Sequence, residues 1–463
     1  MHEDLAYLEL TEIAELIRTR QITSTEVTTK ILERIDALQD RLQPYATVMR
    51  TEALAAAARA DEEISRGRYR GPLHGVPVAV KDLACTVDAP TGAGTTIFEG
   101  FMADHDATVV TRLLDAGAVL LGKLRMTEGA FTSHHPDLPS PVNPWDAETW
   151  AGSSSSGSGV ATAAGLAYAT LGSDTGGSIR LPSSQNGITG LKPTWGRVSR
   201  YGIFDLAQSL DHVGPMCRSA KDAAVVLSVI AGRDENDPTS AVVPVPAYED
   251  NLRLPCAPVV GFDPSLNAHF DEETRDMLAR TLTTVRELGW RVVEVETPGF
   301  LEAAEDWQGL CAVETAQVHA ETYPSRKDEY GPALAGLIEQ GRAMTVIKYQ
   351  TLMERRRAFT GNMHRLFADI DLLLIPGVGI ASPTLAQIDK LGEDPEVLAG
   401  VIVPTAPLDN CGFPTITLPS GTSRRGTPLA IQFAAGPFQE QLLFGAGAAF
   451  QAATDFHRSH PEL

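Results

Sequence analysis

The chain has 463 residues, 43% of them hydrophobic and 21% charged, which is typical of a globular protein with a sizeable core. It contains 38 lysine and arginine residues against 59 aspartate and glutamate residues, giving a formal net charge of −21. So acidic a chain is not expected to bind nucleic acid or an anionic membrane surface.

The five cysteines are far apart and form no CxxC pair, so neither a disulfide framework nor a zinc site is supported. The first residues lack the basic and apolar regions of a signal peptide, and no apolar run approaches 18 residues. We therefore expect a cytoplasmic protein that has no membrane association.

In chain order, hydrophobic periodicity predicts helices throughout residues 8–66. A short β-rich run, 76–80, then ends at Lys81. The amphipathic stretch 107–116 and the apolar run 118–121 follow as a helix and a strand. Such alternation builds buried sheets, so an α/β protein is predicted.

Residues 143–202 are rich in glycine and serine but contain the apolar run 160–171, so we expect loops packed on a core. Residues 238–258 hold five prolines and are predicted to form a surface crossover. The other predicted elements are helices at 220–231, 271–288, within 300–370 and at 439–454, and strands at 258–262, 290–295, 370–375, 414–418 and 428–433.

Several common motifs are absent, namely the nucleotide P-loop, the GxSxG elbow and HExxH. His134 and His135 are adjacent, so they would point in different directions on a regular element. The acidic loop 234–237 lacks the spacing of a calcium-binding loop. No metal site is expected.

Three features suggest chemistry: Lys81, the Gly/Ser segment 152–159 and the segment 172–180. Glycines around a serine allow backbone N–H groups to converge on one point, as an oxyanion hole requires. A buried lysine with a lowered pKa can act as a base for a serine hydroxyl. Alone, each feature would be an ordinary loop or a lysine that reaches solvent, but together they supply a nucleophile, a base and N–H donors.

These motifs together resemble the amidase signature family. The resemblance covers essentially the whole chain except for a variable stretch from about 235 to 400. It rests on segments 75–82, 122–123, 152–158, 172–180, 190–194, 196–199, 209–215, 428–432 and 453–457.

The resemblance implies an α/β fold with a central mixed sheet covered by helices on both faces and an N-terminal helical segment. It also implies a single domain, 1–463. Its segments are the N-terminal helices (1–68), the signature core (69–232), the variable substrate-side region (233–400) and the C-terminal strands and helix (401–463).

By the family pattern, Lys81 is the base and Ser178 the nucleophile of a Ser–cis-Ser–Lys triad. The bridging serine is placed at Ser154, with Ser155 as the alternative, because Ser153 and Ser156 replace two glycines of the family motif. Ser154 would relay the proton from Ser178 to neutral Lys81, and the same relay would protonate the leaving amine before water hydrolyses the acyl-enzyme.

The backbone around Thr175, Gly176 and Gly177, together with Ser178, would form the oxyanion hole. Asp174 and Arg180 are expected to order this loop rather than react. The mechanism would need no cofactor.

The leading hypothesis is a hydrolase of small amides, aryl amides or carbamates. The alternatives are a hydrolase of urea derivatives such as allophanate or biuret, and the glutaminase subunit of a tRNA-dependent amidotransferase. Segment 209–215 resembles the free amidases more than that subunit, which usually has Asp-Gln-Ile in the middle. An inactive binding scaffold is disfavoured because all three triad residues are retained. A homodimer is left open.

Substrate choice is expected to depend on the variable stretch. Trp307, Tyr323, Tyr330 and Met344 are candidates for the pocket mouth, although packing in the core or at the surface is the preferred interpretation of each. Trp150 is a candidate for narrowing or covering the acyl site.

Overall fold

The computed structural model describes residues 4–250 and 252–463. Its strands are β1 (Tyr45–Val48), β2 (Pro77–Lys81), β3 (Val119–Leu124), β4 (Ala169–Asp174), β5 (Thr189–Lys192), β6 (His212–Cys217), β7 (Val259–Phe262), β8 (Arg291–Glu294), β9 (Leu372–Pro376), β10 (Thr415–Thr422) and β11 (Pro428–Ala434).

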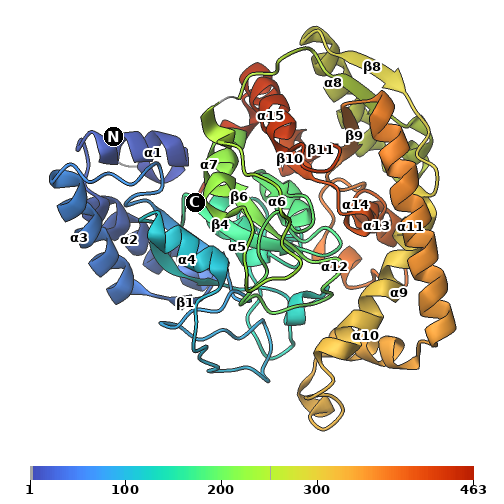
Figure 1. Cartoon of the computed structure of the whole chain (residues 1–463), viewed down its shortest axis with the longest axis horizontal. Helices are drawn as coiled ribbons and strands as arrows, with labels where there is room; N and C mark the ends of the chain where they lie inside the picture. The colour runs from blue at the N-terminus through green and yellow to red at the C-terminus, as the bar shows by residue number, and fades with distance from the viewer. Residues whose placement is uncertain (1–3, 251) are drawn as a thin grey trace.

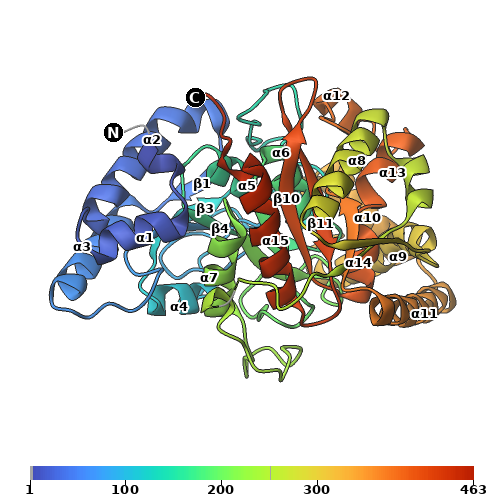
Figure 2. The ribbon, with the colours of Figure 1, turned by 90° about the horizontal axis from the view of Figure 1, so that it is seen from above.

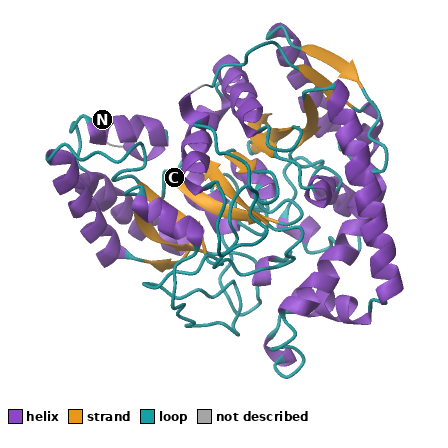
Figure 3. Ribbon diagram, in the orientation of Figure 1, coloured by secondary structure: helices purple, strands orange, loops and turns teal. Residues whose placement is uncertain are grey.

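In the described residues these strands form one 11-stranded sheet in the order β1-β3-β2-β4-β6-β5-β10-β11-β9-β7-β8. Parallel and antiparallel pairs both occur, so the sheet is mixed. The strands cross the middle of the molecule and helices flank them (Figure 3). The predicted fold class is confirmed.

The helices of the first half include α2 and α3 at one end of the molecule (Figure 1). Helices α9 to α11 lie at the opposite end. The helices are α1 (Leu10–Arg18), α2 (Ser24–Leu42), α3 (Arg50–Ser65), α4 (Thr108–Asp115), α5 (Ser156–Ala163), α6 (Arg180–Asn186), α7 (Ala220–Ile230), α8 (Glu272–Glu287), α9 (Phe300–Val318), α10 (Pro332–Ala343), α11 (Val346–Asp369), α12 (Leu385–Ile388), α13 (Pro395–Ile402), α14 (Ala406–Cys411) and α15 (Glu440–Thr454).

Short 3-10 helices join these elements at Asp4–Tyr7, Glu128–Ala130, Tyr248–Asp250, Pro264–His269, Lys327–Glu329 and Phe456–Arg458. Within the described residues, no helix is both long enough and apolar enough to span a membrane.

The parallel strands at the centre of the sheet position the candidate site. Strand β2 pairs in parallel with β4, with Val80 opposite Leu171. The carboxyl ends of parallel strands meet at the same edge of a sheet, where ligands commonly bind. Lys81 at the end of β2 therefore lies beside the end of β4, from which the chain enters the loop that carries Ser178.

The glycine- and serine-rich region contains more regular structure than the sequence predicts. It packs on the core as expected, but it forms α5, β4, α6 and β5 rather than loops alone. Small residues make this packing feasible: a Cβ at Gly157 would lie 2.5 Å from the carbonyl oxygens of Pro44 and Arg125. The prediction failed because glycine and serine are weak helix formers, and burial overrides that preference here.

The prediction of helices throughout 8–66 is also wrong in one place. Strand β1 interrupts them and pairs antiparallel with β3. Four residues between two helices are too few to show the alternation that identifies a strand.

Strand β10 joins the two halves of the chain. It pairs antiparallel with β5 on one side and with β11 on the other. Helix α15 packs on β10 and against α7, so the last helix returns to the first half of the molecule (Figure 2).

Candidate active site

Lys81 is a buried cation at the end of β2, only 1% exposed. Its Nζ lies 2.6 Å from Ser154 Oγ and 2.8 Å from Ser173 Oγ. Burial lowers the pKa of Lys81 to about 7, although the carboxylates of Asp174 and Asp211 act in the opposite direction. A large fraction of this amine is therefore neutral at physiological pH, as a base must be.

Of the two candidate bridging serines, Ser154 faces the lysine. The Ser153–Ser154 peptide bond is cis, and Ser154 is 1% exposed. The hydroxyl of Ser155 instead donates to the carbonyl oxygen of Ser173, at 3.1 Å. Ser156, which stands where the family has glycine, begins α5, and its hydroxyl lies 3.2 Å from His134 Nε2.

Ser178 is half-buried in a loop that folds around the carboxylate of Asp174. That carboxylate accepts hydrogen bonds from the N–H groups of Gly177 at 2.6 Å and Ile179 at 2.9 Å. The N–H of Gly177 is thus engaged inside the loop, which corrects the prediction that it faces a substrate. The amides of Gly176 and Ser178 remain as candidate oxyanion donors.

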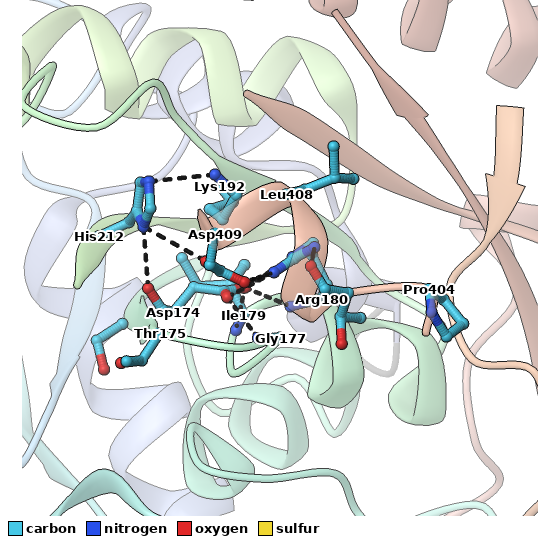
Figure 4. Close-up of polar contacts among 12 residues, drawn as sticks. Asp174, Thr175, Gly177, Ile179, Arg180, Lys192, His212, Pro404, Leu408 and Asp409 are labelled. Carbon is cyan, nitrogen blue, oxygen red and sulfur yellow. Dashed lines mark hydrogen bonds and ion pairs between the residues drawn. The ribbon is translucent and has the colours of Figure 1, made fainter. Parts of the chain in front are cut away.

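Arg180 supports the same loop from behind (Figure 4). It is fully buried and bonds Asp174 through Nε at 3.0 Å and Nη2 at 2.8 Å. It also donates to the carboxylate of Asp409 and, at 2.8 Å, to the carbonyl oxygen of Thr405. These contacts fit the expectation that Asp174 and Arg180 order the loop.

The charges in this network shift one another's pKa values. Burial alone would raise the pKa of Asp174, but the charge and hydrogen bond of Arg180, the charge of Lys192 and the N–H of Ile179 together hold that pKa well below its usual range. Burial, together with the nearby carboxylate of Asp174, raises the pKa of Asp409 well above its usual range. The two carboxyl groups beside the buried guanidinium are thus shifted in opposite directions.

His212 and Lys192 complete the network (Figure 4). His212 Nδ1 lies 3.1 Å from the carbonyl oxygen of Asp174, and Nε2 lies 3.2 Å from Lys192 Nζ. A carbonyl oxygen only accepts, so Nδ1 carries the proton and Nε2 accepts from the lysine. Burial and the nearby lysine lower the pKa of His212 well below its usual value.

Two site residues were not singled out from the sequence. Ser173 contacts Lys81, and Asp211 accepts from the Thr175 hydroxyl at 2.6 Å. Burial raises the pKa of Asp211 to about 7. Both residues stand inside segments that carry the family resemblance, which was the available signal, but their contacts depend on the fold.

A pocket of about 620 Å³ opens in front of Ser178. Ser153, Thr175 and Gly176 also line it, whereas Lys81 and Ser154 lie behind its wall. The described residues that line it include no lysine, arginine or histidine, and two acidic ones, Glu305 and Asp389. Most of the other lining side chains are apolar: Ala130, Phe131, Trp150, Leu181, Leu206, Ala304, Trp307, Ala333, Ile388, Leu391, Leu398, Val401 and Ile402.

The aromatic candidates divide into two groups. Trp150 lines the pocket, as expected, whereas Trp307 does both, since it packs against the main core and also lines the pocket. Tyr323 and Tyr330 are buried together in a small apolar cluster, and Met344 packs against the main core, so packing is the correct interpretation of these three.

A large mixed sheet, with a buried lysine beside two serine-bearing loops at one edge, defines an α/β protein with a candidate active site. The chain belongs to the amidase family, whose model matches residues 26–444. It is therefore an amide hydrolase by family.

Individual relatives agree with this family assignment. The chain is 56% identical over 459 residues to AmiD, a protein of Mycobacterium tuberculosis named as an amidase, covering 99% of this chain and 97% of AmiD. It is 36% identical to one subunit of the glutamyl-tRNA(Gln) amidotransferase of Moorella thermoacetica, covering 99% of each chain. The structure of the peptide amidase from Stenotrophomonas maltophilia superposes with a TM-score of 0.85 at 31% identity, covering 98% of each chain.

Proposed function

We propose that the protein hydrolyses small uncharged amides, aryl amides or carbamates through a Ser178 acyl-enzyme. The observation that carries this proposal is the buried contact of 2.6 Å between Lys81 Nζ and Ser154 Oγ. A lysine with a pKa of about 7 that contacts a hydroxyl behind the pocket wall is suited to moving a proton rather than to binding an anion.

In the proposed reaction, neutral Lys81 takes a proton from Ser154 as Ser154 takes one from Ser178. Ser178 Oγ attacks the carbonyl carbon, and backbone N–H groups of the loop bind the oxyanion. The relay then returns the proton to the leaving amine. Water then enters, gives up a proton to the same relay and attacks the ester carbonyl. The ester bond breaks, the acid leaves, and the relay returns the proton to Ser178 Oγ.

The pocket lining supports an uncharged substrate. Among the substrates of the alternatives from the sequence analysis, glutamine and allophanate carry a carboxylate, whereas biuret does not. A carboxylate leaving water needs a cation or several N–H donors, since an unpaired buried charge is costly. The described lining offers no basic side chain and two acidic ones.

The first prediction distinguishes the roles of three serines in turnover. Ser178→Ala and Ser154→Ala should each lower kcat by several orders of magnitude, because both belong to one proton relay. Ser155→Ala is the matched control and should retain most of the rate, since its hydroxyl bonds a backbone carbonyl instead. Steady-state kinetics on the best amide substrate check this, with circular dichroism to verify folding.

Labelling gives an independent readout. A fluorophosphonate should modify Ser178 in the wild type, as located by peptide mapping. Near-normal turnover by Ser178→Ala, or a label on another serine, would refute the nucleophile assignment.

The second prediction concerns substrate charge. On a panel of primary amides, anilides and carbamates, kcat/KM should exceed that for glutamine and allophanate by at least about 100-fold, as expected where a carboxylate would lie unpaired. Preference for glutamine, or activity that appears only with a partner protein and tRNA, would support the amidotransferase alternative instead.

A further inference from the structure

Trp307 comes from α9, outside the short segments whose motifs resemble the family, yet it touches the Ser178 loop at two points. Its indole Nε1–H donates to the carbonyl oxygen of Thr175, at 2.7 Å. Its ring lies against Gly176, where an added Cβ would be 2.4 Å from Trp307 Cζ2. A tryptophan of the pocket wall therefore holds one peptide of this loop.

The contact determines the direction of an N–H group. In a trans peptide the C=O and N–H bonds point in opposite directions. Because Trp307 holds the carbonyl of Thr175 on one side, the N–H of Gly176, in the same peptide, is directed to the other. The indole also polarises this peptide, which makes its N–H a stronger donor.

The neighbouring peptides follow an alternating pattern. The carbonyl oxygen of Gly177 accepts from the N–H of Leu181 at 2.7 Å, so the N–H of Ser178 is fixed in the same way. Between them, the N–H of Gly177 is held by the carboxylate of Asp174. The pocket accordingly meets Gly176 and Ser178 but not Gly177.

From this geometry we propose that Trp307 is a positioning residue that orients the Gly176 N–H, so that the amides of Gly176 and Ser178 together bind the developing oxyanion. The inference rests on the proposed function and adds a device to it. Since Ala304, Glu305 and Gln308 of the same helix line the pocket, α9 couples the shape of the substrate wall to the strength of an oxyanion donor.

The test is Trp307→Phe, which keeps an aromatic ring and removes the N–H donor. Loss of a whole oxyanion donor costs about 100- to 1,000-fold in kcat. When the Gly176 N–H is present but Trp307 no longer holds its peptide, kcat should fall roughly 10- to 100-fold. We expect that fall with 4-nitroanilides of every acyl length, with little change in KM.

A second readout isolates the oxyanion. A trifluoromethyl ketone, which forms a tetrahedral adduct with the serine, should bind Trp307→Phe more weakly by a similar factor. The corresponding alcohol, which forms no adduct, should bind as it does to the wild type. Trp150→Phe, a second tryptophan of the same pocket, is the matched control and should change the affinity of both ligands together, in a way that depends on acyl size.

A change in KM alone, or an equal loss of affinity for ketone and alcohol, would show that Trp307 lines the pocket without positioning the Gly176 N–H. Either result would overturn the inference. Should Trp307→Phe fail to fold, benzothienylalanine at position 307 keeps the shape of the indole and replaces its N–H by sulfur. The same fall in kcat is expected there. If this variant has full activity while Ser178→Ala is inactive, only the inference fails; if Ser178→Ala is active, the proposed function fails.

Discussion

At the scale of single residues, the environment of Lys81 leads to a prediction about pH. With a pKa of about 7, its neutral fraction rises from roughly 10% at pH 6 to roughly 90% at pH 8. Because only the neutral amine accepts a proton, kcat/KM should climb through this range and level off above it. A pH–rate profile of kcat/KM measures this rise, the basic limb of the profile.

Asp211 shapes that limb. Its own pKa lies near 7, and its ionisation favours the charged form of the lysine. The two titrations are coupled, so we expect the limb to be broader than a one-proton curve.

Lysine variants supply the control for the pH profile. Lys81→Ala should lose the limb together with most of the rate, and Lys81→Arg should not restore it, since arginine stays protonated. An acid optimum, or an active arginine variant, would contradict the assignment of Lys81 as the base.

The residue scale also shows what local sequence can reveal. Lys81, Ser154 and Ser178 were identified because they stand in short motifs whose residue types are visible in one segment. The contact between Trp307 and Thr175 joins positions 132 apart in the chain, so no motif records it. The orientation of the Gly177 amide depends on where the side chain of Asp174 points, which a sequence pattern does not specify.

At the scale of secondary-structure elements, the N-termini of two helices show the same difference between local and long-range contacts. Helix α2 has a local capping box, in which Thr23 and Glu26 each accept from the other's backbone N–H. That signal is visible in the sequence. Helix α1 has a local box as well, since the Glu12 side chain accepts from the N–H of Glu9 at 2.8 Å. It is also capped by a residue far away in the sequence: the carboxylate of Asp222, from α7, accepts from the N–H groups of Leu10 and Thr11 at 3.0 Å each.

A stability prediction follows from this long-range cap. Asp222→Ala should lower the free energy of unfolding by about 1–3 kcal/mol, because it leaves buried N–H groups without an acceptor. Burial raises the pKa of Asp222 from its ordinary value of 3.8 to about 6, so the folded state binds this proton more tightly than the unfolded chain, and the stabilising contribution of Asp222 should fall as the pH rises through 6. Denaturant titration at pH 8 and at pH 5 measures both effects.

The matched control is Thr23→Ala, which removes a local cap and should cost about 1 kcal/mol at either pH. Both variants should keep the wild-type kcat. If Asp222→Ala were as stable as the wild type, the carboxylate would not be the cap of α1.

At the scale of the whole molecule, the order of strands could not be predicted from the sequence. Short β-rich or apolar runs predict most strands one at a time, but pairing such as that of β5 with β10 links residues 189–192 to residues 415–417. Register over such separations is determined by the completed core rather than by neighbouring residues. The family resemblance predicts the class of fold, whereas the structure shows which strands are neighbours in the sheet.

The anchoring of Arg180 by Thr405 and Asp409 has a consequence for biosynthesis. The residues proposed to perform the chemistry all leave the ribosome within the first 178 positions, but the partners that hold their loop arrive more than 220 residues later. The loop of a nascent chain therefore carries Ser178 before Thr405 and Asp409 are present to anchor Arg180. Translation must pass α14 before Arg180 has both of these partners, so we expect fragments that end before residue 405 to be inactive.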